Sequence, residues 1–150
     1  MKDLIIKNIA DVEPTVIDRG TNTFTKKSVV GGADIDSCEV AFIEVPVGEY
    51  AFGHHYHDQS EEVFYIVSGA GRLRHAGGET DVKAGDMLCF PNGEKGAHVV
   101  SNTSDTEPLI FIDFDVRKPG GADIVVFPDM GKMAVIPANG PRAMVDLPTE

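Results

Sequence analysis

The chain has 150 residues, enough for one domain with a sizeable core and too few for two. Its 13 basic and 24 acidic residues give a formal net charge of −11, which disfavours nucleic acid and anionic membrane surfaces as partners. No apolar run approaches the ~18 residues of a membrane span, and charges interrupt residues 1–7, so we expect no membrane partner and a cytoplasmic location.

The pattern of the chain predicts an all-β protein. Prolines and glycines interrupt every segment before an amphipathic helix could form, and the apolar runs are short and β-branched. We expect a short strand or turn near residues 5–6, an edge strand over residues 24–30, and a strand over residues 38–47. The two faces of this last strand carry Val40, Phe42 and Glu44, and Ala41, Ile43 and Val45.

Three histidines follow within residues 48–69. His55 and His57 are two residues apart, so on an extended backbone both imidazoles point to the same face of a sheet, as two ligands of one metal must. His54 would point to the opposite face, so we expect it to be exposed or hydrogen-bonded rather than a ligand.

A glutamate opens the next strand. The β-branched and aromatic residues of 62–67 favour a strand that places Glu62 on the same face as Phe64 and Ile66. Glu61 then points away and is expected to be solvated. Two imidazoles and a carboxylate on adjacent strands suit a first-row divalent cation. In the alternative interpretation the histidines form a solvated loop and the two glutamates form a charged strand edge.

The second half of the chain continues this pattern. Residues 71–75 are expected to pair with residues 79–82 across Gly77 and Gly78, which tolerate the positive φ of a hairpin turn. His75 belongs to this hairpin and is expected at the surface. Further strands are predicted over residues 87–90, 97–102 and 109–116. Such a series of short strands indicates a sandwich or barrel.

Other polar residues give weaker signals. Cys38 and Cys89 lie in strand-like surroundings without metal-ligand spacing, so we expect buried free thiols. Four further residues alternate on predicted strands and belong either to a pocket or to a solvent face. They are Arg72, Arg74, Asp113 and Asp115.

The histidine blocks resemble the paired motifs of the cupin superfamily. The first motif is a glycine, a His-x-His pair, a glutamate and a glycine, and it is matched by His55, His57, Glu62 and Gly69. The second is a glycine, Pro-x-Gly, a histidine and an asparagine, and it is matched by Gly85, Pro91, Gly93, His98 and Asn102.

The resemblance covers roughly residues 38–117. Gly48 lies one residue too far upstream for the first motif, so either a bulge at Gly53 or a register that uses His54 stays open. Residues 127–132, Phe-Pro-Asp-Met-Gly-Lys, are similar to a C-terminal segment of small bacterial single-domain cupins.

The resemblance implies a double-stranded β-helix of the jelly-roll type. The single domain, residues 1–150, would consist of a barrel over about 38–117, an N-terminal extension 1–37 and a C-terminal extension 118–150. Related small cupins commonly pair, which implies a homodimer. Residues 24–30 and 124–127, which are apolar without an obvious core, would be covered in such a dimer.

The residues and the resemblance together predict a mononuclear metal site at the mouth of the barrel. Its ligands would be His55, His57, Glu62 and His98, with apolar walls that include Phe64 and Ile66. This ligand set admits iron(II), manganese, nickel or zinc. Each ligand histidine must be neutral, so binding is expected to weaken as pH falls, by up to about three powers of ten per pH unit.

Such a site leaves coordination positions open for a small-molecule ligand or substrate. The resulting hypothesis is a dioxygenase, isomerase or lyase that acts on a small polar metabolite. The alternatives are a module that binds a sugar or carboxylate without turnover, and a structural cupin with a vestigial site. No residue of the sequence identifies itself as an acid or base beside the metal.

Overall fold

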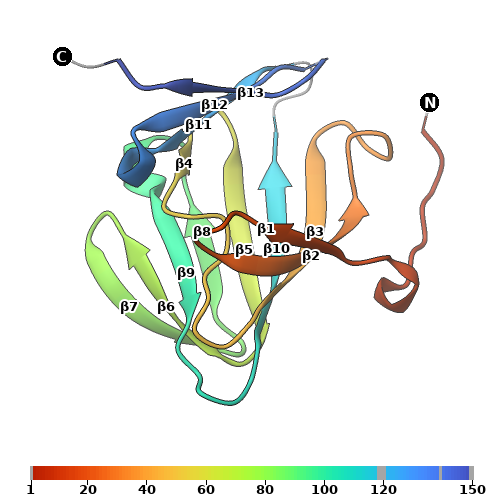
Figure 1. Cartoon of the computed structure of the whole chain (residues 1–150). Helices are drawn as coiled ribbons and strands as arrows, with labels where there is room; N and C mark the ends of the chain where they lie inside the picture. Colours follow the sequence, from red (N-terminus) through yellow and green to blue (C-terminus); the bar gives the residue numbers. More distant parts are fainter. Residues whose placement is uncertain (1, 118–120, 139, 149–150) are drawn as a thin grey trace.

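The computed structural model describes residues 2–117, 121–138 and 140–148. Within these ranges the chain forms thirteen strands in three antiparallel sheets, and the all-β prediction is confirmed (Figure 1). No helix in the described ranges is long and apolar enough to cross a membrane. Three single-turn 3₁₀ helices join the strands: η1 (Ile9–Asp11), η2 (Glu94–Gly96) and η3 (Pro128–Met130).

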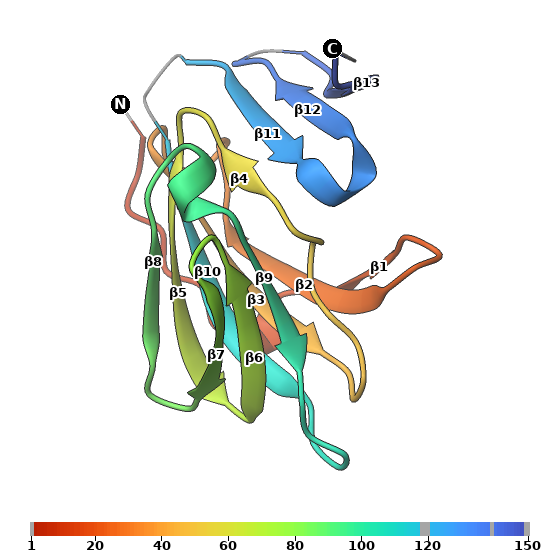
Figure 2. The same cartoon turned by 90° about the vertical axis from the view of Figure 1, so that its left-hand side faces the viewer.

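Two sheets face each other and form the barrel (Figure 2). The larger sheet has the order β1 (Thr15–Asp18), β2 (Thr23–Val30), β3 (Cys38–Val45), β10 (Leu109–Val116), β5 (Glu61–Ser68) and β8 (Met87–Phe90). The smaller has the order β7 (Gly78–Lys83), β6 (Ala70–His75) and β9 (His98–Asn102).

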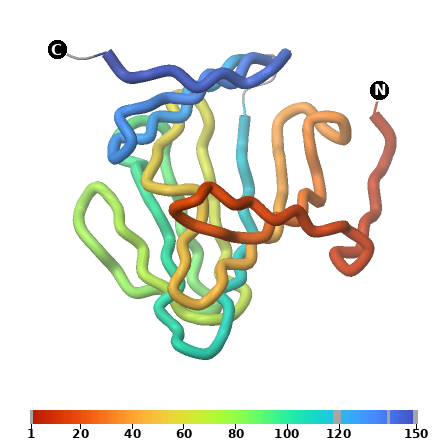
Figure 3. The backbone as a smooth tube through the Cα atoms, in the orientation of Figure 1, coloured from red at the N-terminus to blue at the C-terminus, as the bar shows by residue number. Residues whose placement is uncertain are grey.

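A third sheet lies across one end of the barrel, where the blue C-terminal strands meet yellow β4 (Figures 1 and 3). Its order is β13 (Ala143–Asp146), β12 (Lys132–Ile136), β11 (Asp123–Phe127) and β4 (Tyr56–His57). The C-terminal extension is therefore paired with a strand from the middle of the chain and covers the mouth of the barrel.

The core lies between the two barrel sheets and is built by strict alternation. On β10, Phe111 is fully buried and its ring stacks on Phe64 of β5 with centroids 4.6 Å apart. The predicted common face of Glu62, Phe64 and Ile66 is confirmed and is buried, and on β3 the structure shows that the face with Ala41, Ile43 and Val45 is the inner one. The predicted hairpin of β6 and β7 also forms, with His75 at its turn.

Three expectations from the sequence are wrong. Residues 5–6 form no strand, and β2 is not an edge, because β1 pairs with it on the side opposite β3. Residues 124–127 lie in β11, which is paired on both sides by β12 and β4. Of these partners only β4 is distant in the chain, whereas β1 and β12 pair with β2 and β11 across short turns.

The outer face of the six-stranded sheet is also apolar. β10 places Ile110, Ile112 and Phe114 there, and the neighbouring strands add Tyr65 and Met87, which is 60% exposed. Both cysteines are free, as predicted, but they point to this outer face. Cys89 is exposed and Cys38 is half-buried, so the expectation of buried thiols was wrong.

The homodimer stays a prediction, and this outer face is where we expect it to form. Contiguous exposed apolar patches on a sheet face often mark contacts between proteins. Replacing Met87 with lysine, next to Tyr65 on the neighbouring strand, should shift the mass measured by light scattering at micromolar concentration from two chains to one. A single-chain mass for the unmodified protein would contradict the prediction.

Candidate metal centre

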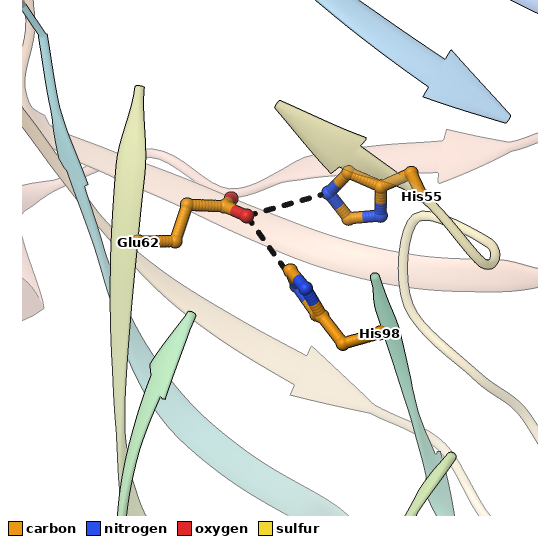
Figure 4. A group of neighbouring side chains, drawn as sticks. All are labelled: His55, Glu62 and His98. Carbon is orange, nitrogen blue, oxygen red and sulfur yellow. Dashed lines mark ion pairs between the residues drawn. The ribbon is translucent and has the colours of Figure 1, made fainter. Parts of the chain in front are cut away.

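Three strand ends bring the predicted ligands together. His57 lies on β4, Glu62 lies on the inner face of β5, and His98 begins β9. His55 precedes β4 and pairs with His98, since each backbone N–H donates to the other residue's carbonyl, at 3.0 and 2.9 Å. Figure 4 shows the side chains of His55 and His98 directed at Glu62 of β5.

The four side chains meet at the glutamate. Glu62 Oε2 lies 3.5 Å from His55 Nε2 and 3.4 Å from His98 Nε2, and Glu62 Oε1 lies 3.4 Å from His57 Nε2. All four residues are buried. These separations are long for charge-assisted hydrogen bonds. The ligand atoms of His55, Glu62 and His98 all lie within 4.8 Å of one another, which suits donors that bond one ion at about 2.0–2.2 Å. The donor set therefore fits a transition metal.

Backbone carbonyls fix the orientation of two imidazoles. Nδ1 of His55 lies 2.9 Å from the Gly53 carbonyl, and Nδ1 of His98 lies 2.8 Å from the Gly96 carbonyl. Each Nδ1–H therefore donates, and each Nε2 keeps its lone pair directed at the site. Nε2 of His98 is buried without a hydrogen-bond partner among the described residues, as expected for a metal-ligating nitrogen.

Close packing of the backbone requires a glycine at position 96. A Cβ on Gly96 would lie 1.8 Å from the carbonyl oxygen of Pro91. Gly96 ends η2, the single turn that precedes β9. The Pro91 turn thus positions the carbonyl that orients His98.

The third imidazole is held by a carboxylate that sequence reasoning missed. Asp123, the first residue of β11, accepts a hydrogen bond of 2.6 Å from His57 Nδ1–H. Its other oxygen accepts from the backbone N–H groups of Gln59 and Ile124. A carboxylate that orients a ligating histidine is a common feature of metal sites. Nothing in the sequence around Asp123 signals this role.

Replacing Asp123 with asparagine should lower metal affinity about 10- to 100-fold. An amide offers one acceptor oxygen where Asp123 uses two, so either His57 or the Gln59 backbone loses its partner. Competition with a chromophoric chelator measures the affinity. Asp129→Asn is the control, because Asp129 is exposed and pairs with Arg74 outside the site. Equal affinities of the two variants would contradict the role of Asp123.

The histidines have different proton affinities in the metal-free protein. Burial and the neighbouring His55 lower the pKa of His98 to about 3, so it stays neutral. Burial opposes a proton on His57, but the carboxylates of Asp123 and Glu62 outweigh it and raise its pKa to about 10. The raised pKa stabilises the metal-free fold fully below the unfolded value of about 6.5, and this stabilisation is lost as pH rises towards 10.

Metal binding should therefore release about one proton per ion between pH 7.5 and 9, and affinity should rise about tenfold per pH unit. This dependence is weaker than the one expected from sequence, which assumed an ordinary pKa for all three histidines. Calorimetry in two buffers with different ionisation enthalpies measures the proton release. A release close to zero would contradict the protonated state of His57.

A cavity of about 290 Å³ is lined by three of the four side chains, His55, His57 and Glu62. Its apolar walls come from Phe52 and from the third sheet, including Val125, Phe127 and Ile136. The expected walls, Phe64 and Ile66, instead lie in the core. The C-terminal extension thus supplies much of the space in which a ligand would bind.

Two aspartates line the same cavity. Asp113 and Asp115 lie on the inner face of β10, and Asp115 is paired in register with Glu62. Burial, reinforced by the charge of Glu62, raises the pKa of both carboxyls, that of Asp113 strongly. The sequence left these residues undecided between pocket and solvent, and the structure places them in the pocket. Arg72 and Arg74 instead pair with exposed aspartates outside the barrel.

The remaining candidates lie outside the cluster. Nδ1 of His54 faces Asp129 at 3.6 Å, and Glu61 is exposed. Of the two registers left open by the sequence, the structure forms the one in which His55 and His57 face Glu62. His57, Glu62 and Asp115 form a second group that could hold a metal, since each offers one ligand atom and these atoms lie within 4.8 Å of one another.

The chain was compared with known proteins. The family model for the cupin domain matches residues 41–115. The oxalate-binding protein of Thermotoga maritima is 33% identical over 67 residues, 45% of this chain and 53% of that protein. The match thus spans about half the length of this curated relative.

Solved structures share the fold over most of the chain. A sugar phosphate isomerase of the cupin superfamily from Silicibacter pomeroyi has a TM-score of 0.78 at 21% identity, covering 93% of this chain and 90% of its own. A predicted oxalate decarboxylase from Thermotoga maritima has a TM-score of 0.69 at 23% identity, covering 76% and 100%. These likenesses confirm the predicted double-stranded β-helix.

Proposed function

Because this chain belongs to the cupin domain family, we propose that it binds one divalent transition metal and uses it to bind and transform a small polar metabolite. The proposed ligands are His55, His57, Glu62 and His98. The observation that carries the proposal is the convergence of three oriented Nε2 atoms on one buried carboxylate. Iron(II), manganese, nickel and zinc all suit this donor set.

The residues around the site favour proton-transfer chemistry of the isomerase or lyase type. A bound divalent ion would act as a Lewis acid on a substrate oxygen. Asp115 lies beside Glu62 in the cavity, and burial there, reinforced by the charge of Glu62, raises its pKa. A carboxyl group in this state suits a general acid or base. The apolar third sheet would exclude water from the reacting atoms.

A second candidate function is binding without turnover. It is favoured by the 33% identity to an oxalate-binding protein over part of the chain. In that case a carboxylate ligand would occupy the open coordination positions, and the aspartates would only shape the cavity.

Metal content tests the proposal first. Protein stripped by a chelator and reconstituted with each of the four metals should retain close to one ion per chain for at least one of them. Elemental analysis after gel filtration gives the ratio. No retained metal after reconstitution with any of the four would contradict the proposal.

Exchange in deuterium oxide separates the enzyme from the binding module. An isomerase or lyase should catalyse incorporation of deuterium into a bound hydroxy acid or sugar, followed by proton NMR. Asp115→Asn should slow this exchange about 100-fold or more. Binding of the same compounds without any exchange would favour the binding module.

Two further features belong to the proposal. The barrel and both extensions would form one domain, since β11 pairs with β4 and Asp123 holds His57. The free thiols of Cys38 and Cys89 suit a reducing compartment such as the cytoplasm.

A further inference from the structure

One lysine occupies an inward-facing position of the barrel. Lys26 lies on β2 opposite Ile43 and two residues after the buried Phe24, so its side chain points to the cavity side of the sheet. Lysines at such positions are rare unless they are paired. Among the described residues no carboxylate forms an ion pair with Lys26. Its Nζ instead lies 5.9 Å from the centroid of the Phe52 ring, at the wall of the metal cavity.

A second cavity continues the first on the side of Lys26. It has a volume of about 200 Å³ and ends at Ser28 and Gly31. The two cavities have five lining residues in common: Lys26, Glu39, Asp113, Asp115 and Arg142. The space is therefore elongated, with the histidine cluster in one part and Lys26 and Arg142 where the two parts meet.

The metal cavity is lined by four basic and four acidic side chains. Four of the 13 basic residues line the metal cavity: Arg19, Lys26, Arg117 and Arg142. Arg117 is paired with Glu39 at 3.0 Å, and Arg19 donates to the Phe52 carbonyl. Lys26 and Arg142 form no ion pair among the described residues, so they are the basic groups that remain for the anionic group of a ligand.

Hydrogen-bond acceptors lie between the two parts. Oδ1 of Asp113 and Oδ1 of Asp115 are buried, and neither has a partner among the described residues. Buried acceptors are usually satisfied, and ligand hydroxyl groups would supply the missing donors. Oxalate has no hydroxyl group, so it would leave both oxygens without a donor.

We propose that the ligand is a hydroxylated anion whose carboxylate or phosphate group binds Lys26, assisted by Arg142. Its hydroxyl groups would donate to Asp113 and Asp115, and an oxygen at its other end would reach the metal. The inference rests on the proposed function, because the metal defines that other end. The inference adds that Lys26 is the residue that selects an anionic substrate over an uncharged one.

Calorimetry on the manganese-loaded protein tests the assignment with four probes. Gluconate carries a carboxylate, glucitol 6-phosphate carries a phosphate, glucitol is the uncharged polyol, and oxalate reaches only the metal. At least one of the two anionic polyols should bind about tenfold or more tightly than glucitol, because a hydrogen bond to a charged group contributes about 1.5–3 kcal/mol. The tighter of the two identifies the anionic group.

Lys26→Met should remove most of this advantage, about tenfold or more, and leave oxalate affinity unchanged within about threefold. Lys27→Met is the matched control. Lys27 follows on the same strand, carries the same charge, and points to the other face, where it donates to the Ile9 carbonyl. The control should bind all four probes as the unmodified protein does.

Three outcomes would overturn the inference. These are equal affinities for the anionic polyols and glucitol in the unmodified protein, equal losses in the two lysine variants, and a loss of oxalate affinity as large as the loss for the polyols. Failure of the proposed function is recognised separately, by the metal content of the unmodified protein before any probe is added. Protein without bound metal would contradict both.

Discussion

Replacing His98 with alanine is expected to lower the affinity for a divalent metal by more than about 100-fold. Loss of a residue that only orients a ligand typically costs 10- to 100-fold, and loss of the ligand itself should exceed this range. The lone pair of His98 Nε2 would be lost, while His55, His57 and Glu62 stay in place. Chelator competition at pH 7.5 measures the affinity.

Two further variants make this result specific. His75→Ala removes a half-buried histidine that contacts Thr80 in the hairpin, outside the metal cluster, and should bind metal normally. The His98 ring also stacks on Phe90 with centroids 3.6 Å apart, so His98→Ala loses packing as well as a ligand. Glu62→Gln keeps the volume of the side chain and should show a comparable loss. Normal metal affinity in both site variants would show that the metal lies elsewhere.

Phe111→Ala should reduce the free energy of unfolding by about 3–5 kcal/mol. The Phe111 side chain is fully buried between the two barrel sheets and stacks on Phe64. Its removal therefore leaves a cavity in the core and takes away apolar surface whose burial stabilises the folded state. Urea denaturation of the metal-free protein measures the change, which keeps metal binding out of the comparison.

Leu4→Ala is the control for this measurement. It also shortens a large apolar side chain, but Leu4 is 88% exposed, so the change should stay within about 0.5 kcal/mol. A loss below about 1 kcal/mol for Phe111→Ala would contradict the placement of Phe111 at the centre of the core.

Local patterns were sufficient for most strands of the barrel. Alternation and turn glycines identified β3, the β6–β7 hairpin and β10, whose ends agree with the predicted range 109–116. The strands that were missed carry little local signal. β4 has only two residues and β13 only four, so neither is long enough to show a clear alternation.

The candidate ligands could be proposed from sequence because histidine and glutamate spacing is a local property. Asp123 could not be proposed from sequence, because it lies 66 residues from His57 along the chain. The position of Asp113 and Asp115 in the pocket could not be predicted for a different reason. β10 is apolar on both faces, with Phe111 inside and Ile112 and Phe114 outside, so its alternation did not reveal which face is inner.

Proton affinities at the site also depend on distant contacts. His57 and His98 are equivalent as sequence letters, yet the pKa of His57 is raised to about 10 and that of His98 is lowered to about 3. Burial lowers the pKa of both residues, but at His57 the carboxylates of Asp123, from the C-terminal sheet, and Glu62 outweigh it, whereas the neighbouring His55 lowers the pKa of His98 further.

X-ray absorption spectroscopy of the reconstituted protein tests the central claim most directly, because it reports the atoms bound to the metal. The account predicts one ion per chain, with a first shell that contains the imidazoles of His55, His57 and His98 and the carboxylate of Glu62. A shell built from oxygen atoms alone, without imidazole scattering, would place the ion on surface carboxylates of this acidic chain and contradict the proposed centre.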